Sequence, residues 1–235
     1  MLRVEDVHTY YGESYILQGA TIEVPEKQIV ALLGRNGVGK TTLVRSIMGL
    51  TPARRGKITF QDKEITQLKP YTIAQMGIGY VPQGRMLFPS LSVAEHLKIA
   101  QRKGKDGEEK WTVERILEAF PQLKERIQNR GGQLSGGEQQ MAAIARALAA
   151  NPEFLLMDEP TEGLAPIIVS ELGNLLQMIK EDGYPVLLVE QNYKFALRFA
   201  DTIYIMSKGT IVFKGLPEEI EEDDELKRKH LGIYD

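Results

Sequence analysis

The sequence feature that most constrains the fold is a glycine-rich segment, Gly34–Thr42, which reads Gly-Arg-Asn-Gly-Val-Gly-Lys-Thr-Thr. It satisfies the pattern Gly-x-x-x-x-Gly-Lys-[Ser/Thr] of phosphate-binding loops. The apolar run before it, Ile29–Leu33, is typical of a buried parallel strand, and Leu43, Ile47 and Leu50 after it recur at helical spacing. A strand, a glycine loop and a helix in this order predict a phosphate site in an α/β fold.

The residue types in this segment suit that chemistry. The glycines let the backbone curl so that amide N–H groups converge on phosphate oxygens at the positive end of the following helix. Lys40 is expected to reach the β- and γ-phosphates, and the Thr41 hydroxyl to bind Mg²⁺. The predicted phosphate-binding residues are Gly34, Arg35, Asn36, Gly37, Val38, Gly39, Lys40, Thr41 and Thr42. A glycine-rich turn that binds nothing is the alternative, which the flanking strand and helix disfavour.

Composition excludes several other kinds of site. The chain has 235 residues and a formal net charge of −3, so no global basic field predicts binding to nucleic acid or anionic lipid. It has no cysteine, which excludes disulfides, thiol catalysis and zinc-thiolate sites. The first residues lack a signal-peptide pattern, and the longest apolar stretch, Met141–Ala150, is too short to span a bilayer. We therefore expect a soluble intracellular protein.

Another apolar run, Phe154–Met157, ends in two carboxylates, Asp158 and Glu159. Asp158 suits a Mg²⁺ site because hard cations prefer oxygen ligands. Glu159 is then placed to take a proton from an attacking water molecule. We expect these acids to face the phosphate-binding loop; two acids without a chemical role are the less favoured alternative.

A second anion-binding terminus is predicted at Leu134–Gln140, where Ser135, Gly136 and Gly137 precede an apolar helical face. A helix start with a hydroxyl and free N–H groups attracts anions. Because Gly34–Thr42 already holds one set of phosphates, we infer a nucleotide shared between two copies of the chain. A plain capped helix is the alternative on spacing alone.

Two further candidates remain open on the residues alone. Tyr11 belongs to an aromatic pair at a turn, and it could stack on a purine or be an ordinary strand-end tyrosine. Gln83 follows the predicted strand Gly77–Val81, at the sheet edge where α/β folds bind ligands, but taken alone a solvated loop residue is the favoured interpretation.

Taken together, the glycine loop at 34–42, the sequence Leu-Ser-Gly-Gly-Glu at 134–138 and the acidic strand end at 154–159 resemble the ATP-binding subunits of ABC transporters. The resemblance covers essentially the whole chain. It implies a single domain, 1–235, in which residues 1–84 and 151–235 form a P-loop NTPase core with a parallel sheet and an N-terminal antiparallel β portion. Residues of about 85–150 would form a helical signature subdomain.

The same resemblance implies roles for the candidate residues. ATP and Mg²⁺ would be the cofactors, with Tyr11 stacking on adenine. Gln83 would sense Mg²⁺ and the γ-phosphate and connect to the membrane subunits. Ser135 and Gly137 would contact the γ-phosphate bound by the other protomer. Catalysis would involve Glu159, Lys40, Gln83 and Gln191. Thr41, Gln83 and Asp158 would lie at the metal.

The resemblance also implies partners and a location. Two transmembrane permease subunits, a sister ATPase or a second copy of the chain, and indirectly an extracytoplasmic solute-binding protein are expected, without nucleic acid. The chain would be peripheral at the cytoplasmic face of the inner membrane, with no transmembrane segment of its own. A soluble, non-transport ABC ATPase is the rival class, but it usually carries a second cassette, coiled-coil arms or basic extensions.

Two positions depart from the common family pattern. Gln191 stands where most members have a switch histidine, and the three histidines of the chain lie elsewhere. Ala165 stands where many members carry an aspartate. The segments that contain Gln191 and Ala165, together with Val81–Arg85, resemble the corresponding sequences of importer ATPases for branched-chain and other hydrophobic amino acids. The related urea and short-amide importers are the alternative, which the segments Arg35–Gly39 and Pro160–Gly163 favour.

Overall fold

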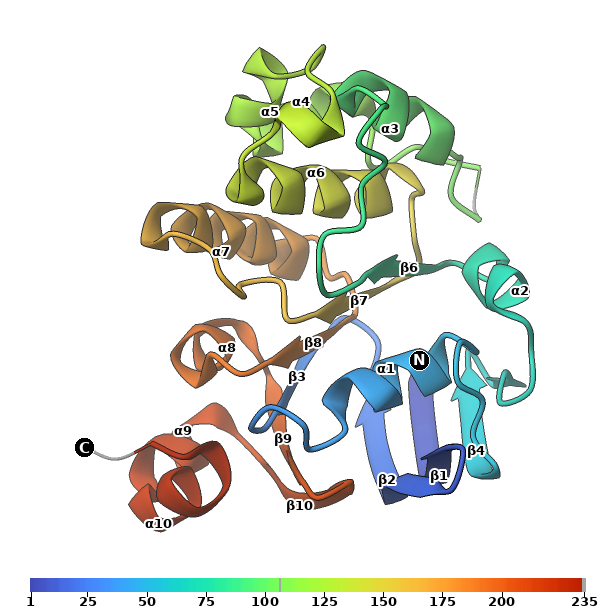
Figure 1. Cartoon of the computed structure of the whole chain (residues 1–235), viewed down its shortest axis with the longest axis vertical. Helices are drawn as coiled ribbons and strands as arrows, with labels where there is room; N and C mark the ends of the chain where they lie inside the picture. The colour runs from blue at the N-terminus through green and yellow to red at the C-terminus, as the bar shows by residue number, and fades with distance from the viewer. Residues whose placement is uncertain (106, 234–235) are drawn as a thin grey trace.

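The computed structural model describes residues 1–105 and 107–233, which form two β-sheets, and most of the helices lie around the larger sheet (Figure 1). Asp106, Tyr234 and Asp235, which the predicted single domain includes, lie outside the described residues. The elements are β1 (Leu2–Tyr11), β2 (Ser14–Val24), β3 (Ile29–Leu33), α1 (Lys40–Ile47), β4 (Arg55–Phe60), β5 (Lys63–Glu64), α2 (Pro70–Gln75), β6 (Ile78–Val81), α3 (Val93–Ala100), α4 (Val113–Ala119), α5 (Pro121–Glu125), η1 (Gly131–Gln133), α6 (Gly136–Ala149), β7 (Phe154–Asp158), α7 (Pro166–Glu181), β8 (Val186–Glu190), α8 (Tyr193–Phe199), β9 (Thr202–Ser207), β10 (Thr210–Gly215), α9 (Pro217–Glu222), α10 (Asp224–Leu226) and η2 (Lys227–Leu231).

The larger sheet has the strand order β10-β9-β3-β8-β7-β6, and all neighbours are parallel except β10 and β9. Every residue of β3, β7 and β8 is buried, as expected for strands covered by helices on both faces. Parallel strands place their carboxyl ends at one edge of the sheet. The glycine loop after β3, the acids ending β7, Gln83 after β6 and Gln191 after β8 therefore share that edge.

The smaller sheet is antiparallel, with the order β2-β1-β4-β5. Its buried side chains and those of α1 form one apolar cluster, which includes Leu43, Val44 and Ile47. The prediction that Leu50 continues this helical face is wrong. Gly49, with a φ of 67°, follows the helix end, and Leu50 is 43% exposed.

Helices α3 to α6 occupy residues 93–149 and lie together at the top of Figure 1. Helix α6 packs its apolar face, including Met141, Ile144 and Leu148, into the second core cluster. The predicted fold class is confirmed: a P-loop α/β core with a parallel sheet, an antiparallel β portion and a helical portion. The boundaries at 84 and 150 stay predictions. Among the described residues, no helix has the length and apolar character that a membrane crossing requires.

Candidate functional site

The predicted phosphate loop encloses a cavity of about 280 Å³ at the carboxyl edge of the parallel sheet. Gly37 and Gly39 adopt φ angles of 80° and 114°, which side chains other than glycine rarely tolerate. The lining residues are Ile16, Asn36, Gly37, Gly39, Lys40, Thr41, Thr42, Gln83 and Glu159. The structure thus brings the loop together with Gln83 and Glu159, as predicted.

Lys40 is buried at the start of α1, and its ammonium group is held by the site itself. Its Nζ donates hydrogen bonds to the carbonyl oxygens of Gly34, at 2.8 Å, and Arg35, at 3.2 Å. The same atom lies 2.9 Å from Oε1 of Glu159, and both side chains are almost inaccessible to solvent. A buried pair of this kind compensates two charges that would each be costly alone. Incoming phosphate oxygens would be new partners for Lys40.

Two oxygen-bearing side chains lie beside this pair. The Thr41 hydroxyl donates to Oδ1 of Asp158 at 3.3 Å, while Oδ2 of Asp158 is buried without a hydrogen-bond partner. Burial, and secondarily the nearby Glu159 carboxylate, raise the pKa of Asp158 to about 6, against a lowering by Thr41. A buried carboxylate oxygen without a partner, next to a hydroxyl, fits a hard divalent cation.

Gln83 contacts the acids that follow β7. Its Nε2 donates to Oε2 of Glu159 at 3.1 Å and to Oε2 of Glu162 at 2.9 Å. Sequence reasoning predicted Gln83 and Glu159 as site residues but missed Glu162. The only sequence signal was its place three residues after Glu159, in the loop that turns away from the sheet edge.

The carboxyl end of β8 forms a neighbouring cavity of about 310 Å³, which Gln191 and Glu159 both line. Glu190 fixes the backbone here, because its carboxylate accepts hydrogen bonds from the N–H groups of Thr161, Gln191 and Asn192. Burial is the main cause that raises the pKa of Glu190. Glu190 was not predicted as a site residue, although an acid that ends a fully buried strand was a usable signal.

The signature residues Ser135, Gly136 and Gly137 do not line either of these cavities. Ser135 caps α6: its hydroxyl accepts from the N–H of Glu138 at 3.3 Å, and the Glu138 carboxylate accepts from the N–H of Ser135. Gly137 packs so closely on Ile168 of α7 that a Cβ would lie 2.8 Å from its side chain. Within one chain the two predicted anion-binding termini therefore stay apart.

The predicted adenine-stacking residue is Tyr11. Tyr11 is 44% exposed and does not line the cavity of the phosphate loop. Ile16 does line it, although nothing in the sequence indicated this. The pairing of β1 with β2 shifts register between Thr9 and Tyr10, which leaves Ile16 as the extra residue of a bulge in β2. Such a bulge depends on how the two strands pair and not on the residue pattern along β2.

The histidines take no part in these cavities. His96 is buried, where its Nε2 accepts from the N–H of Phe88 and its Nδ1 is bonded to the carbonyl of Ser92. His8 is bonded to Asp6 and Tyr15 on the antiparallel sheet. These contacts agree with a structural role for both.

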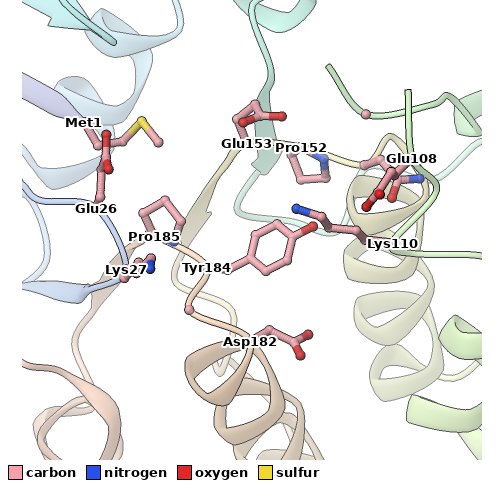
Figure 2. Close-up of a pocket in the computed structure, with 13 residues that line it drawn as sticks. Met1, Glu26, Lys27, Glu108, Lys110, Pro152, Glu153, Asp182, Tyr184 and Pro185 are labelled. Carbon is pink, nitrogen blue, oxygen red and sulfur yellow. The ribbon is translucent and has the colours of Figure 1, made fainter. Parts of the chain in front are cut away.

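A further cavity, of about 170 Å³, lies at the opposite, amino-terminal edge of the parallel sheet (Figure 2). Its lining includes residues that lead into three core strands: Lys27 for β3, Glu153 for β7 and Pro185 for β8. The Tyr184 ring reaches across it towards Lys110, and burial raises the pKa of Tyr184 to about 12. None of the predicted site residues lines this cavity.

Known proteins share this architecture and sequence. A family model described as ABC transporter matches residues 17–162. The branched-chain amino acid transport ATP-binding protein BraG of Pseudomonas aeruginosa is 38% identical over 99% of this chain and 100% of its own length. The probable branched-chain amino acid transport protein LivF of Archaeoglobus fulgidus is 36% identical, over the full length of both. The lipopolysaccharide export protein LptB of Escherichia coli is 34% identical over 98% of this chain and 97% of its own.

Solved structures agree. A nucleotide-free ATP-binding cassette from an ABC transporter superposes with a TM-score of 0.84 at 28% identity, covering 100% of this chain and 99% of that chain. A dimeric cassette in a post-hydrolysis state, bound to ADP and phosphate, gives a TM-score of 0.80 at 29% identity, covering 92% of this chain and 99% of that chain. The chain therefore belongs to the ABC transporter family, as an ATP-binding subunit whose ATP hydrolysis is coupled to transport.

Proposed function

We propose that the chain energises an importer for branched-chain or other hydrophobic amino acids. BraG and LivF, to which it is similar over its whole length, are named for branched-chain amino acid transport. The residues that depart from the common ABC pattern, Gln191 and Ala165, favour the same group. ABC ATPases dimerise and work with transmembrane permease subunits, and we infer two permeases and a sister ATPase for this one.

The proposed engine is a dimer that closes on two ATP molecules and opens after their hydrolysis. Each nucleotide would lie between the phosphate loop of one subunit and Ser135–Gly137 of the other. One observation carries this proposal: within a single chain, the signature residues do not line the cavity of the phosphate loop. A second subunit is the simplest source of the missing contacts.

The side chains of the cavity have complementary proposed tasks. Glu159 accepts the proton of the attacking water once phosphate oxygens have replaced it as a partner of Lys40. Gln83 and Gln191 donate amide hydrogen bonds near the γ-phosphate. Thr41 and Asp158, with Gln83 nearby, would hold Mg²⁺, which neutralises phosphate charge when bound. Gln191 cannot carry a proton, so Glu159 is the proposed base.

Exposed apolar side chains follow the cavity. Met86 is 65% and Phe88 is 59% exposed, three and five residues after Gln83. A link of only a few residues suits a docking surface for a permease, because motion at Gln83 would reach these side chains directly. We accordingly propose a peripheral location on the cytoplasmic face of the inner membrane, with a solute-binding protein on the other side.

Two other cargoes compete with amino acids. The 34% identity with LptB favours lipopolysaccharide export as a second candidate, and the sequence of the phosphate loop favours urea or short amides as a third. The residues that bind the transported substrate lie in other subunits, so the sequence of the ATPase gives little direct information on the identity of that substrate.

The decisive experiment is mass spectrometry of the proteins that co-purify with the tagged chain from gently solubilised native membranes. Two permeases, a sister ATPase and a solute-binding protein are expected. Titration of that binding protein with leucine and with urea then identifies the cargo. Recovery of exporter subunits would replace the import proposal, and recovery of ribosomal or DNA-repair proteins without membrane partners would indicate a soluble ABC ATPase.

A further inference from the structure

Stacked side chains brace the β1–β2 hairpin next to Tyr11. The rings of Tyr10 and Tyr15, which are cross-strand partners, stack with centroids 4.5 Å apart and planes 7° apart. The guanidinium carbon of Arg54 lies 4.5 Å from the centre of the Tyr10 ring. Its Nη2 donates a 2.6 Å hydrogen bond to the carbonyl of Gly12. Arg54 thus contacts both the strand and the turn that follows Tyr11.

Tyr11 lies on the other face of β1 from Tyr10, because successive side chains of a strand alternate. β1 is regular here, since the bulge lies in β2. The Thr9 hydroxyl is bonded to the Ser46 hydroxyl of α1 at 2.8 Å, so the Thr9 face is turned to the phosphate-loop helix. Tyr11, two residues on, shares that face.

The segment that carries Arg54 is itself fastened to α1. The N–H of Thr51 donates to the carbonyl of Arg45 at 3.1 Å, and Nε of Arg45 donates to the Thr51 hydroxyl at 3.2 Å. The N–H of Arg54 donates to the carbonyl of His8 at 2.8 Å. A series of contacts therefore runs from the phosphate-loop helix to the hairpin turn.

The turn is closed by the pairing of Tyr11 with Ser14, but the space around Gly12 is open. Gly12 has a φ of 57°, and apart from its two chain neighbours no heavy atom of the described residues lies within 4 Å of the position of a Cβ on it. The carbonyl of the first residue in a two-residue turn points away from the strand ladder, so its partner is either solvent or a group from outside the hairpin. Arg54 provides that partner, although its own side chain is exposed.

We propose that Arg54 is a positioning residue for the nucleotide base, holding the hairpin so that Tyr11 stands ready to stack on adenine. Arg54 itself touches neither the base nor the reacting atoms. The inference rests on the proposed role of Tyr11 in ATP binding. It adds Arg54, which packs on the Tyr10 face of β1, as a second residue that supports this role. Pre-organisation of this kind lowers the entropy lost on binding rather than the barrier of the chemical step.

The test compares Arg54→Ala with the wild type by steady-state ATPase kinetics of the intact chain. The KM for ATP is expected to rise about three- to tenfold, with kcat changed less than twofold, because only binding geometry is lost. Arg55→Ala is the matched control: Arg55 is the adjacent exposed arginine and its charge also acts on Tyr15, but the hydrogen bond to the Gly12 carbonyl comes from Arg54. Its KM should not change. Arg54→Lys, which keeps the charge but not the planar fork, should fall in between.

A double-mutant cycle separates positioning from a general structural effect. In a Tyr11→Ala background, Arg54→Ala should raise the KM no further, and melting temperatures should show that all variants are folded. An equal additional rise in that background would overturn the inference. If Tyr11→Ala raises the KM while Arg54→Ala does not, the inference fails alone. If Tyr11→Ala leaves the KM unchanged, the adenine role of Tyr11 fails and the inference with it.

Discussion

The N-termini of α1 and α6 both follow glycine-containing sequence, but they differ in what satisfies their free N–H groups. α1 has Gly39 at its N-cap, no side chain caps it, and its first turn contains no acid. α6 has Ser135 at its N-cap, in a reciprocal capping box with Glu138. The amides of α1 are thus available to an anion from outside the chain, whereas part of those of α6 are satisfied from within.

The cations near the two helix N-termini also differ in their burial and in the acid with which they pair. At α1 the cation is Lys40, which is buried and paired with Glu159. At α6 the exposed Arg126 lies 3.1 Å from Glu138, the acid of the cap. The α1 terminus, the proposed nucleotide site, has a cation and free amides for an anion. The α6 terminus has part of its amides satisfied by its own capping box, and we propose that it is offered to a second subunit.

The largest effect expected from this difference concerns Lys40. Lys40→Met removes the cation at the phosphates, and ATPase activity should fall on the order of 10²- to 10³-fold. ATP binding to the isolated chain should weaken as well, as measured by equilibrium titration. The variant also leaves Glu159 buried without its ion-pair partner, which should lower the free energy of unfolding by about 3 kcal/mol.

The double variant Lys40→Met/Glu159→Gln controls for that stability loss. It removes the buried carboxylate together with the lysine, so most of the unfolding free energy should return while ATP binding to the isolated chain stays weak. Recovery of ATP binding along with stability would mean that Lys40 acts only by supporting the fold.

Ser135→Ala is expected to have the next largest effect and to act only when two subunits meet. ATP binding to the isolated chain should be unchanged, but ATPase activity should fall about 10- to 100-fold through loss of a hydroxyl donor to the shared nucleotide. Loss of the helix cap should also lower the free energy of unfolding by about 1 kcal/mol. Steady-state kinetics and denaturant titration measure the two effects separately.

Ser92 provides a matched control in the same helical portion. It caps α3 through the same reciprocal bonds with Glu95, at 3.2 Å and 2.7 Å, and it does not line either cavity at the carboxyl edge. Ser92→Ala should therefore cost a similar unfolding free energy and leave ATPase activity within twofold of the wild type. Equal activity losses in the two variants would reduce Ser135 to a plain helix cap.

Much of this comparison could be predicted because its sequence signals are local. The apolar runs of β3 and β7 and the helix start at Ser135 need only neighbouring residues to be recognised, and the structure contains all three. The fold class and the ATPase family followed from the same motifs. The end of α1 was misjudged because Leu50 keeps the helical spacing although Gly49 ends the helix.

The unpredicted site residues depend on pairing between distant segments. Ile16 reaches the cavity through a bulge in β2, and Glu190 meets Thr161 because β8 lies beside β7. Arg54 meets Gly12 across 42 positions of sequence. Strand order and register decide these contacts, and the hydrophobic periodicity of each separate segment predicts neither of them.

The smallest expected effect tests whether the acid of the α6 cap has any role beyond local stability. The pKa of Glu138 is lowered, foremost by the hydrogen bond from the Ser135 backbone. The folded protein thus binds this proton less tightly than the unfolded chain, so the stabilisation is present above the unfolded pKa and disappears as the pH falls through the folded one. Glu138→Gln should lower the free energy of unfolding at pH 7 by about 0.5 kcal/mol, and the difference should vanish at acidic pH.

Denaturant titrations of wild type and Glu138→Gln from acidic pH to pH 7 measure the loss of unfolding free energy. Glu95→Gln at α3 is the control, because the pKa of Glu95 is lowered foremost by the equivalent bond from the Ser92 backbone. ATPase activity of Glu138→Gln should stay within twofold, since the carboxamide oxygen still accepts from the Ser135 N–H. A change in activity much larger than that of Glu95→Gln would show that the α6 terminus uses its own acid to control the shared nucleotide. The contrast with α1, which has no acid in its first turn, would then extend from stability to catalysis.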